Sequence, residues 1–220
     1  MKLNSSKTRC IQFNNSETRD FMPQIQLEEG TFLEVIYELK LVGIVISSCL
    51  TWTAHIEYTI KRVNKAIWQL TRFKRLGAPQ EKLITFYILK IRSILMFGSV
   101  CFHSSLTAEL SHKLELQQRK SLAIILGSQY RSYSHARSLT QLPRLDDLRE
   151  KACLEWAIKA QGNPKHSHLF PMNQSNVNTR YRNKFLEYLC HTVKYYNRAI
   201  PHVTRSLNLY SQKNQVSQAQ

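Results

Sequence analysis

Residues 40–76 read KLVGIVISSC LTWTAHIEYT IKRVNKAIWQ LTRFKRL, and this stretch decides the fold. It opens on a continuous apolar run, residues 41–46, which is typical of a buried strand. It turns through residues 47–52 and continues with apolar residues every three or four positions, which predicts an amphipathic helix rich in Lys and Arg. A buried strand that leads through a tight turn into a basic helix indicates a device for holding a nucleic-acid backbone.

Two different stripes run along the predicted helix, residues 53–76. The apolar stripe steps by four and three residues through Ile56, Ile60, Val63, Ile67 and Leu70. The second stripe has the same spacing and consists of Lys61, Lys65, Trp68, Arg72 and Arg75, with Arg62 beside it. Phosphate donors around an aromatic plate are the combination that tracks a nucleic-acid backbone. The alternative is a solvated charged face, with Trp68 packed in part against a neighbouring helix.

Short strands are expected before this helix and further helices after it. Strands are predicted at 10–13, 32–37 and 41–46, the last two joined into an antiparallel hairpin by residues 38–40. Gly77 should end the basic helix and Pro79 should begin the next one at its first position. The further helices are predicted at residues 79–97, 108–126, 144–161 and 181–197. Residues 163–179 read as a linker, residues 200–209 as a short segment, and the end from Ser211 as frayed.

Charge is distributed unevenly along the 220 residues. Residues 1–53 hold five Lys or Arg and six Asp or Glu, so the whole formal net charge of +16 arises after residue 53. Such a balance predicts a polyanionic partner for the later part of the chain. A second basic cluster includes Arg180, Arg182 and Lys184, with tyrosines interleaved among its members.

The cysteines and the apolar runs bear on the compartment. The five cysteines are far apart and form no CxxC pair, which is typical of reduced intracellular thiols rather than a disulfide framework. We find no signal-peptide core, and no apolar run that approaches the length of a membrane span. The expected location is therefore the nucleus or the cytoplasm, without secretion and without a membrane partner.

No constellation for catalysis or metal binding emerges from the sequence. A two-metal site needs carboxylates held close together around the ions. The chain has three aspartates, and the adjacent pair Asp146 and Asp147 is better explained as the acidic first turn of a helix. The pair His166 and His168 lies in a predicted loop without further ligands at the spacing that zinc requires. We expect no metal and no catalytic residue in this chain.

The order of several short motifs resembles the C-terminal part of the reverse transcriptases of non-long-terminal-repeat (LINE-type) retrotransposons. Residues 4–8 match an Asn-x-x-Lys-Thr element that closes the palm in that family. Residues 39–44 resemble the primer-grip hairpin, and residues 50–56 match a Leu-x-Trp-x-x-His-Ile entry into the thumb. Residues 124–130 and 200–205 follow in the expected order. Cys49 and Phe102 depart from the pattern, which usually has Asp and Trp at these positions.

The resemblance implies a polymerase fragment without its catalytic part. In that family the metal-binding aspartates precede the Asn-x-x-Lys-Thr element, so Mg²⁺ would belong to a palm that this chain lacks, and no cofactor is expected here. The resemblance assigns Leu41, Val42 and Gly43 to a primer grip. It places Lys7 at the position of a lysine that approaches the incoming triphosphate.

Together these observations predict an α+β, mostly α fold. Residues 1–52 would form an incomplete palm with its hairpin, 53–162 a helical thumb, 163–179 a linker, and 180–220 a basic C-terminal helix and tail. The expected function is phosphate-mediated binding of RNA/DNA template–primer duplex without catalysis. The alternatives are a functionless or co-opted helical interaction module, and an enzyme whose upstream part is missing from the sequence.

Overall fold

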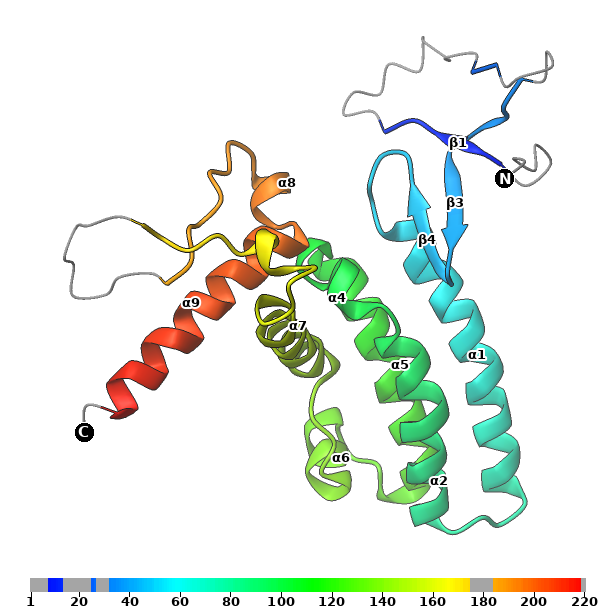
Figure 1. The fold of residues 1–220 in the computed structure, drawn as a ribbon. Helices are drawn as coiled ribbons and strands as arrows, with labels where there is room; N and C mark the ends of the chain where they lie inside the picture. Colours follow the sequence, from blue (N-terminus) through cyan, green and yellow to red (C-terminus); the bar gives the residue numbers. More distant parts are fainter. Residues whose placement is uncertain (1–7, 14–24, 27–31, 175–183, 219–220) are drawn as a thin grey trace. The chain divides into compact units, whose positions relative to one another are not determined.

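The computed structural model describes residues 8–13, 25–26, 32–174 and 184–218 (Figure 1). The chain divides into two compact units, residues 1–62 and 63–220. The structure is mostly helical, with a few short strands in two small sheets, so the predicted α+β, mostly α class is confirmed.

The first unit contains two pairs of short strands. β1, Cys10–Ile11, pairs in parallel with β2, Val35–Ile36. β3, Glu38–Leu41, and β4, Ile44–Ser47, form an antiparallel hairpin in which Leu39 lies opposite Ile46. The first two predicted strands are therefore present in shortened form.

The predicted position of the hairpin turn is wrong. Residues 41–46 are not one strand linked through residues 38–40, because the chain reverses at Val42 and Gly43. Both residues have positive φ, 49° and 87°, as the two-residue turns that suit the twist of a hairpin require. Glycine adopts this conformation without steric cost. Gly43 is therefore a turn signal within residues 41–46, the run that was predicted to be one strand.

Helix α1, Thr53–Arg75, confirms the helix predicted at residues 53–76 and crosses the boundary between the two units. Its apolar stripe lies inside, with Ile56, Val63 and Leu70 fully buried. The helix ends in two hydrogen bonds, from Gly77 N to Lys74 O and from Ala78 N to Phe73 O. This pattern closes the last turn when the following residue is left-handed, and Gly77 has a φ of 79°.

A helical stretch follows whose middle is wider than an α-helix. It consists of α2 (Gln80–Phe86), a π-helical segment η2 (Tyr87–Arg92) and α3 (Ser93–Met96), in place of the single helix predicted at 79–97. Pro79 precedes the helix as its cap rather than opening its first turn. Leu83, Tyr87, Ile91 and Leu95 of this stretch are buried.

This stretch also bears on the membrane prediction. By length and composition, one helical stretch among the described residues, Gln80–Ser105, contains a segment apolar enough to cross a membrane. Lys90 and Arg92 interrupt its apolar run, so the sequence contains no continuous apolar segment of membrane-spanning length here. The finding is weak evidence for a membrane, since the core helix of a globular protein passes the same test.

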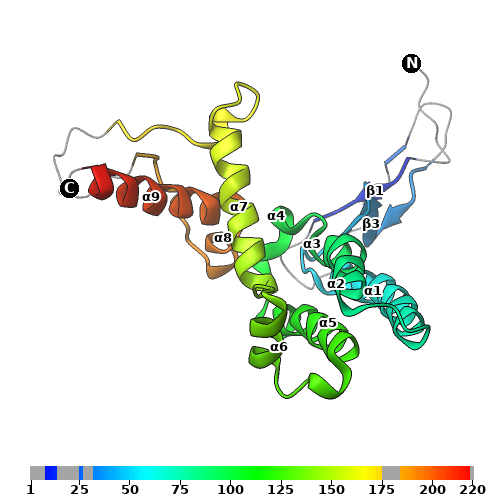
Figure 2. The same ribbon diagram turned by 90° about the horizontal axis from the view of Figure 1, so that it is seen from below.

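The remaining bundle comprises α4 (Ser99–Phe102), η3 (His103–Ser105), α5 (Ala108–Leu126), η4 (Gly127–Gln129), α6 (Tyr133–Thr140) and α7 (Leu145–Gln161). The predictions for α5 and α7 are confirmed, whereas α6 was not predicted. α7 packs against α4, α5 and α9, and α6 lies beside α5 (Figure 2). Buried Gln118 ties three segments together through Tyr87, Tyr133 and the carbonyl oxygen of Pro143.

The C-terminal part differs most from the prediction. The helix predicted at 181–197 is wrong over its described residues: the chain from 184 to 192 is not helical, and only α8, Val193–Tyr196, remains. The Asn208 side chain replaces the helical hydrogen bonds by binding both the amide and the carbonyl of Phe185, at 2.9 and 3.0 Å. α9, Ala199–Gln218, is a full helix through the segment expected to fray.

One apolar cluster joins this region to α7. Phe170, after the short helix η5 (Ser167–Leu169), and Phe185 pack with Cys153 on α7 and Val203 on α9. Met172 pairs with Phe185 through an isolated β-bridge. Residues 163–174, which read as linker, are therefore anchored by a buried phenylalanine at 170.

Candidate nucleic-acid interface

The predicted basic stripe lies on the exposed side of α1. All of its members are exposed, and so is the neighbouring residue Arg62: Lys61, Lys65, Trp68, Arg72 and Arg75. Among the described residues, none of these cations makes an ion pair. The helix carries a single acid, Glu57, in its first part. The face is therefore strongly positive, because its five cations outnumber the single acid of the helix and none of them is ion-paired in the part of the chain that the structure describes.

The sixth basic residue of α1 has a structural role. Lys74 donates from Nζ to the carbonyl oxygen of Ile125, at 2.9 Å, near the end of α5. Its ammonium group thereby satisfies one of the last carbonyls of a helix, where a cation is favourable. Lys74 therefore does not belong to the exposed basic face.

Trp68 stands at the middle of the basic face. Its side chain is 59% exposed, and the Arg72 guanidinium lies 4.9 Å from the ring centroid. An open hollow of about 520 Å³ borders the same ring and is lined by Asn64, Lys65, Trp68 and Gln69. The ring is therefore mostly in solvent, and its less exposed part still allows the partial packing against a neighbouring helix that the alternative describes.

The predicted grip residues occupy the tip of the β3–β4 hairpin. Val42 is 84% exposed and Leu41 is also exposed, while Gly43 forms the second turn position. Next to the tip, two cations lie close to the Tyr58 ring, with Lys40 Nζ 4.5 Å and the Arg62 guanidinium 5.6 Å from its centroid. Arg62 thus belongs to a local cation–π cluster as well as to the basic face.

The second predicted basic cluster is described only in part. Two of its members, Arg180 and Arg182, lie outside the described residues. The same is true of Lys7, the residue that the resemblance places near the incoming triphosphate. Lys184 is exposed, with its Nζ 5.3 Å from the ring centroid of Phe185. Arg205, in the same region, lies 3.5 Å from the ring centroid of Tyr196 and donates to that residue's carbonyl oxygen.

The acidic pair and the two loop histidines considered in the sequence analysis lie at the start of α7 and near η5. Asp146 is held by Arg144, whose Nη2 lies 2.6 Å from its carboxylate, and Asp147 is exposed at the start of α7. His166 and His168 are exposed near η5. The two aspartates therefore stand at a helix N-terminus, where a carboxylate is favourable.

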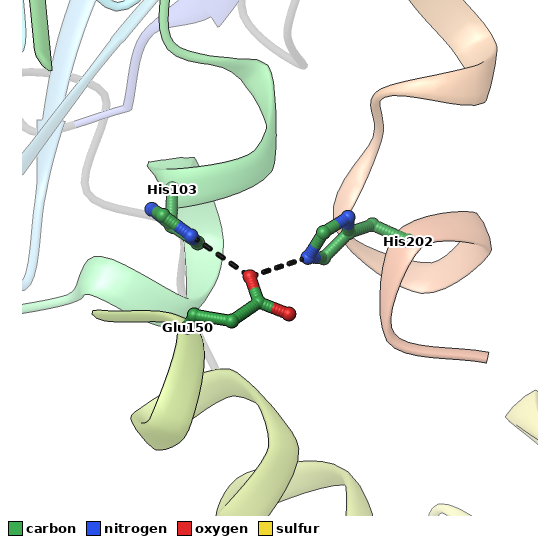
Figure 3. A group of neighbouring side chains, drawn as sticks. All are labelled: His103, Glu150 and His202. Atoms are coloured by element: carbon green, nitrogen blue, oxygen red, sulfur yellow. Dashed lines mark hydrogen bonds and ion pairs between the residues drawn. The ribbon is translucent and has the colours of Figure 1, made fainter. Parts of the chain in front are cut away.

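A cluster that the sequence analysis missed joins three segments of the second unit. His103 on η3 and His202 on α9 point at the same oxygen of Glu150 on α7 (Figure 3). The distances from their Nε2 atoms to Glu150 Oε2 are 3.0 and 2.9 Å. Ser206 donates to the other carboxylate oxygen, at 3.1 Å. Two imidazoles and a carboxylate are also a donor set for a transition metal.

Arg149 decides how this cluster is protonated. Its side chain is fully buried, donating from Nε to His103 Nδ1 at 3.3 Å and from Nη2 to Ser111 Oγ at 2.8 Å. A guanidinium can only donate, so His103 Nδ1 accepts and the ring proton sits on Nε2, facing Glu150. A metal at Nε2 would force the proton onto Nδ1, against Arg149. The residues therefore fit a hydrogen-bonded hub better than a cation site.

Electrostatics agree with that arrangement. Burial lowers the pKa of His103, and the Arg149 charge lowers it further. Burial would raise the pKa of Glu150, but hydrogen bonds from His202, His103 and Ser206 outweigh it and leave that pKa lowered. Glu150 is thus an ionised acceptor between a neutral His103 and a second donor on α9.

One thiol near the hairpin is chemically unusual. Cys49 is exposed, and hydrogen bonds with Ser47 and then Thr51 lower its pKa to about 7. Its Sγ lies 3.4 Å from Ser47 Oγ and 3.1 Å from Thr51 Oγ1. A thiol with a pKa this low is partly ionised at neutral pH and is more reactive than an ordinary cysteine.

Comparison with known proteins adds no family to this description. No protein-family model matches the chain, and neither a curated protein nor a solved structure matches it. The functional argument therefore depends on the site itself.

Proposed function

We propose that this chain is a non-catalytic, nucleic-acid-binding fragment that corresponds to the C-terminal part of a retrotransposon reverse transcriptase. It holds template–primer duplex through phosphate contacts. The observation that carries the proposal is the unneutralised basic face of α1, with Trp68 exposed at its centre. Lys and Arg side chains that are gathered on one helix face can form charge-assisted hydrogen bonds with successive phosphate oxygens.

The hairpin supports the same function from the first unit. Its tip exposes Leu41 and Val42, and the next residue of the strand, Lys40, lies close to the Tyr58 ring, as does Arg62 on α1. An apolar tip with cations close by suits contact with a sugar–phosphate backbone rather than with base edges. We expect no sequence preference, because nothing in this set of residues reads the edge pattern of a paired base.

The absence of catalysis is part of the proposal. Asp146 and Asp147 are arranged as a helix start, and Asp146 is occupied by Arg144. The His103–Glu150–His202 hub is ordered by a buried guanidinium. Metal-dependent primer extension by the purified 220-residue chain would overturn this part.

Salt dependence of binding tests the proposal. If about five cations of α1 contact phosphates, log K for an RNA–DNA hybrid should fall with log salt at a slope of about −4.5. The measurement is fluorescence anisotropy of a labelled hybrid over a salt series. A slope close to zero, or no binding at low salt, contradicts the proposal. Equal affinity for hybrids of unrelated sequence supports readout through the backbone alone.

A further inference from the structure

The exposure of Trp68 is greater than the basic face requires. Phosphate binding needs cations, and a tryptophan contributes nothing to it except a flat surface. The indole is 59% exposed at the middle of a long helix whose apolar stripe lies on another side. Aromatic plates left in solvent beside cations are the feature that single-stranded nucleic acids use, because every base has a flat face that can stack.

The neighbours of Trp68 leave much of the ring open. Arg72 follows by one turn, and its guanidinium lies 4.9 Å from the ring centroid. Asn64 and Lys65 precede it by one turn and, with Gln69, line the open hollow of about 520 Å³. The guanidinium comes from the turn after Trp68, whereas two of the residues that line the hollow come from the turn before it. More than half of the side-chain surface of Trp68 is in solvent, so the ring is accessible to a stacking partner beside the hollow.

The residues around the hollow match the parts of one nucleotide. Lys65 supplies a cation beside the hollow, and Arg72 supplies another close to the ring. The side-chain amides of Asn64 and Gln69 provide donors and acceptors for a base edge. An acidic or purely apolar partner fits less well, since it would leave either the aromatic plate or the cations unused.

We propose that Trp68 and its hollow bind one unpaired base of a single strand, stacked on the exposed part of the indole. The flanking phosphates reach Lys65 and Arg72. This inference rests on the proposed nucleic-acid function and adds to it that the α1 face prefers a strand with an unpaired base over phosphates alone. In a template–primer complex, the base would come from an unpaired part of a strand.

An abasic strand separates stacking from phosphate binding. The full chain is titrated with a labelled single strand of about 12 nucleotides, a length within the usual single-strand site size, and with an abasic strand of the same length. We expect the base-bearing strand to bind about 5- to 150-fold more tightly, the range that stacking of one base provides. It should also quench tryptophan fluorescence.

Variants assign the effect to Trp68. The Trp68→Leu variant should lose the preference for bases and the quenching while it binds the abasic strand unchanged. The control Trp156→Phe, at a tryptophan packed edge-on against Phe170 with ring centroids 6.2 Å apart, should keep the preference. Equal binding of both strands, or a preference that survives Trp68→Leu, overturns this inference and leaves the proposed function standing. No binding of either strand at low salt overturns this inference, and the proposed function falls with it only if the RNA–DNA hybrid does not bind either.

Discussion

Replacing Glu150 with Ala should destabilise the helical unit by about 2 kcal/mol. Glu150 accepts hydrogen bonds from His103, His202 and Ser206, at 2.9–3.1 Å. A hydrogen bond to a charged group contributes about 1.5–3 kcal/mol when it is shielded from water. The Glu150 side chain is 44% exposed, so solvent screening reduces the sum of three such bonds to a fraction of its buried value.

The assay is urea unfolding followed by circular dichroism, with Glu155→Ala as the control. Glu155 lies on the same helix and makes only an exposed pair with Lys151, at 3.8 Å, so its removal should cost less than about 0.5 kcal/mol. Equal losses in the two variants would refute the reasoning about the hub. Zinc provides a second test. If adding zinc to the chelator-treated chain raises its melting temperature, and this rise disappears in Glu150→Ala, the cluster is a metal site and the reasoning about the hub is refuted.

Three further predictions concern the hairpin, the thiol and the pH dependence. Val42→Asn should slow hydrogen exchange of the hairpin amides about 5-fold, because asparagine tolerates a positive φ that costs a β-branched residue about 1 kcal/mol. The control Val42→Ile should leave the exchange rate unchanged. Faster exchange in Val42→Asn would contradict this prediction. Cys49 should be alkylated by iodoacetamide with a rate that rises around pH 7, and a midpoint near pH 9 would contradict the lowered pKa. Folding lowers the pKa of His103, so on acidification the unfolded chain takes up a proton at this imidazole before the folded chain does. The free energy of unfolding should therefore fall as the pH decreases below about 6.5, by at most about 1.4 kcal/mol per pH unit. A free energy of unfolding that rises over that range would refute this prediction.

Local signals account for what the sequence predicted correctly. The start and end of α5 follow from Thr107, whose side chain accepts from the amide of Leu110, and from Gly127, whose φ is 55°. The exposed basic face follows from helical spacing, which separates Lys65 and Arg72 from the buried Val63 and Leu70. Where local periodicity and burial agree, the sequence is sufficient.

The errors have a different physical origin, namely partners that lie far away in the chain. Residues 184–192 carry a helical pattern, but Asn208 on α9 takes the backbone hydrogen bonds of Phe185. The histidine hub joins residues separated by 47 and 52 positions, and neither histidine has a ligand at a recognisable spacing. Tertiary contacts override local preference in the first case and create the cluster in the second.

The central claim is that the basic face of α1 binds phosphates, and charge reversal on that face tests it most directly. The test variant carries Lys61→Glu, Lys65→Glu and Arg72→Glu. Its control carries the same change in net charge at three exposed lysines on other segments: Lys120→Glu, Lys159→Glu and Lys165→Glu.

The measurement is the affinity of both variants for an RNA–DNA hybrid at about 0.1 M salt, after circular dichroism has shown that both retain their helices. At about 0.1 M salt, each phosphate contact raises the binding constant by about 0.9 of a decade over its value at about 1 M salt. Losing three contacts should therefore weaken binding about 500-fold and make the slope of log K against log salt less negative by about 2.7. The control should lose much less and keep its slope. If both variants bind as the unchanged chain does, or lose affinity equally, the face of α1 is a solvated surface and not a binding site.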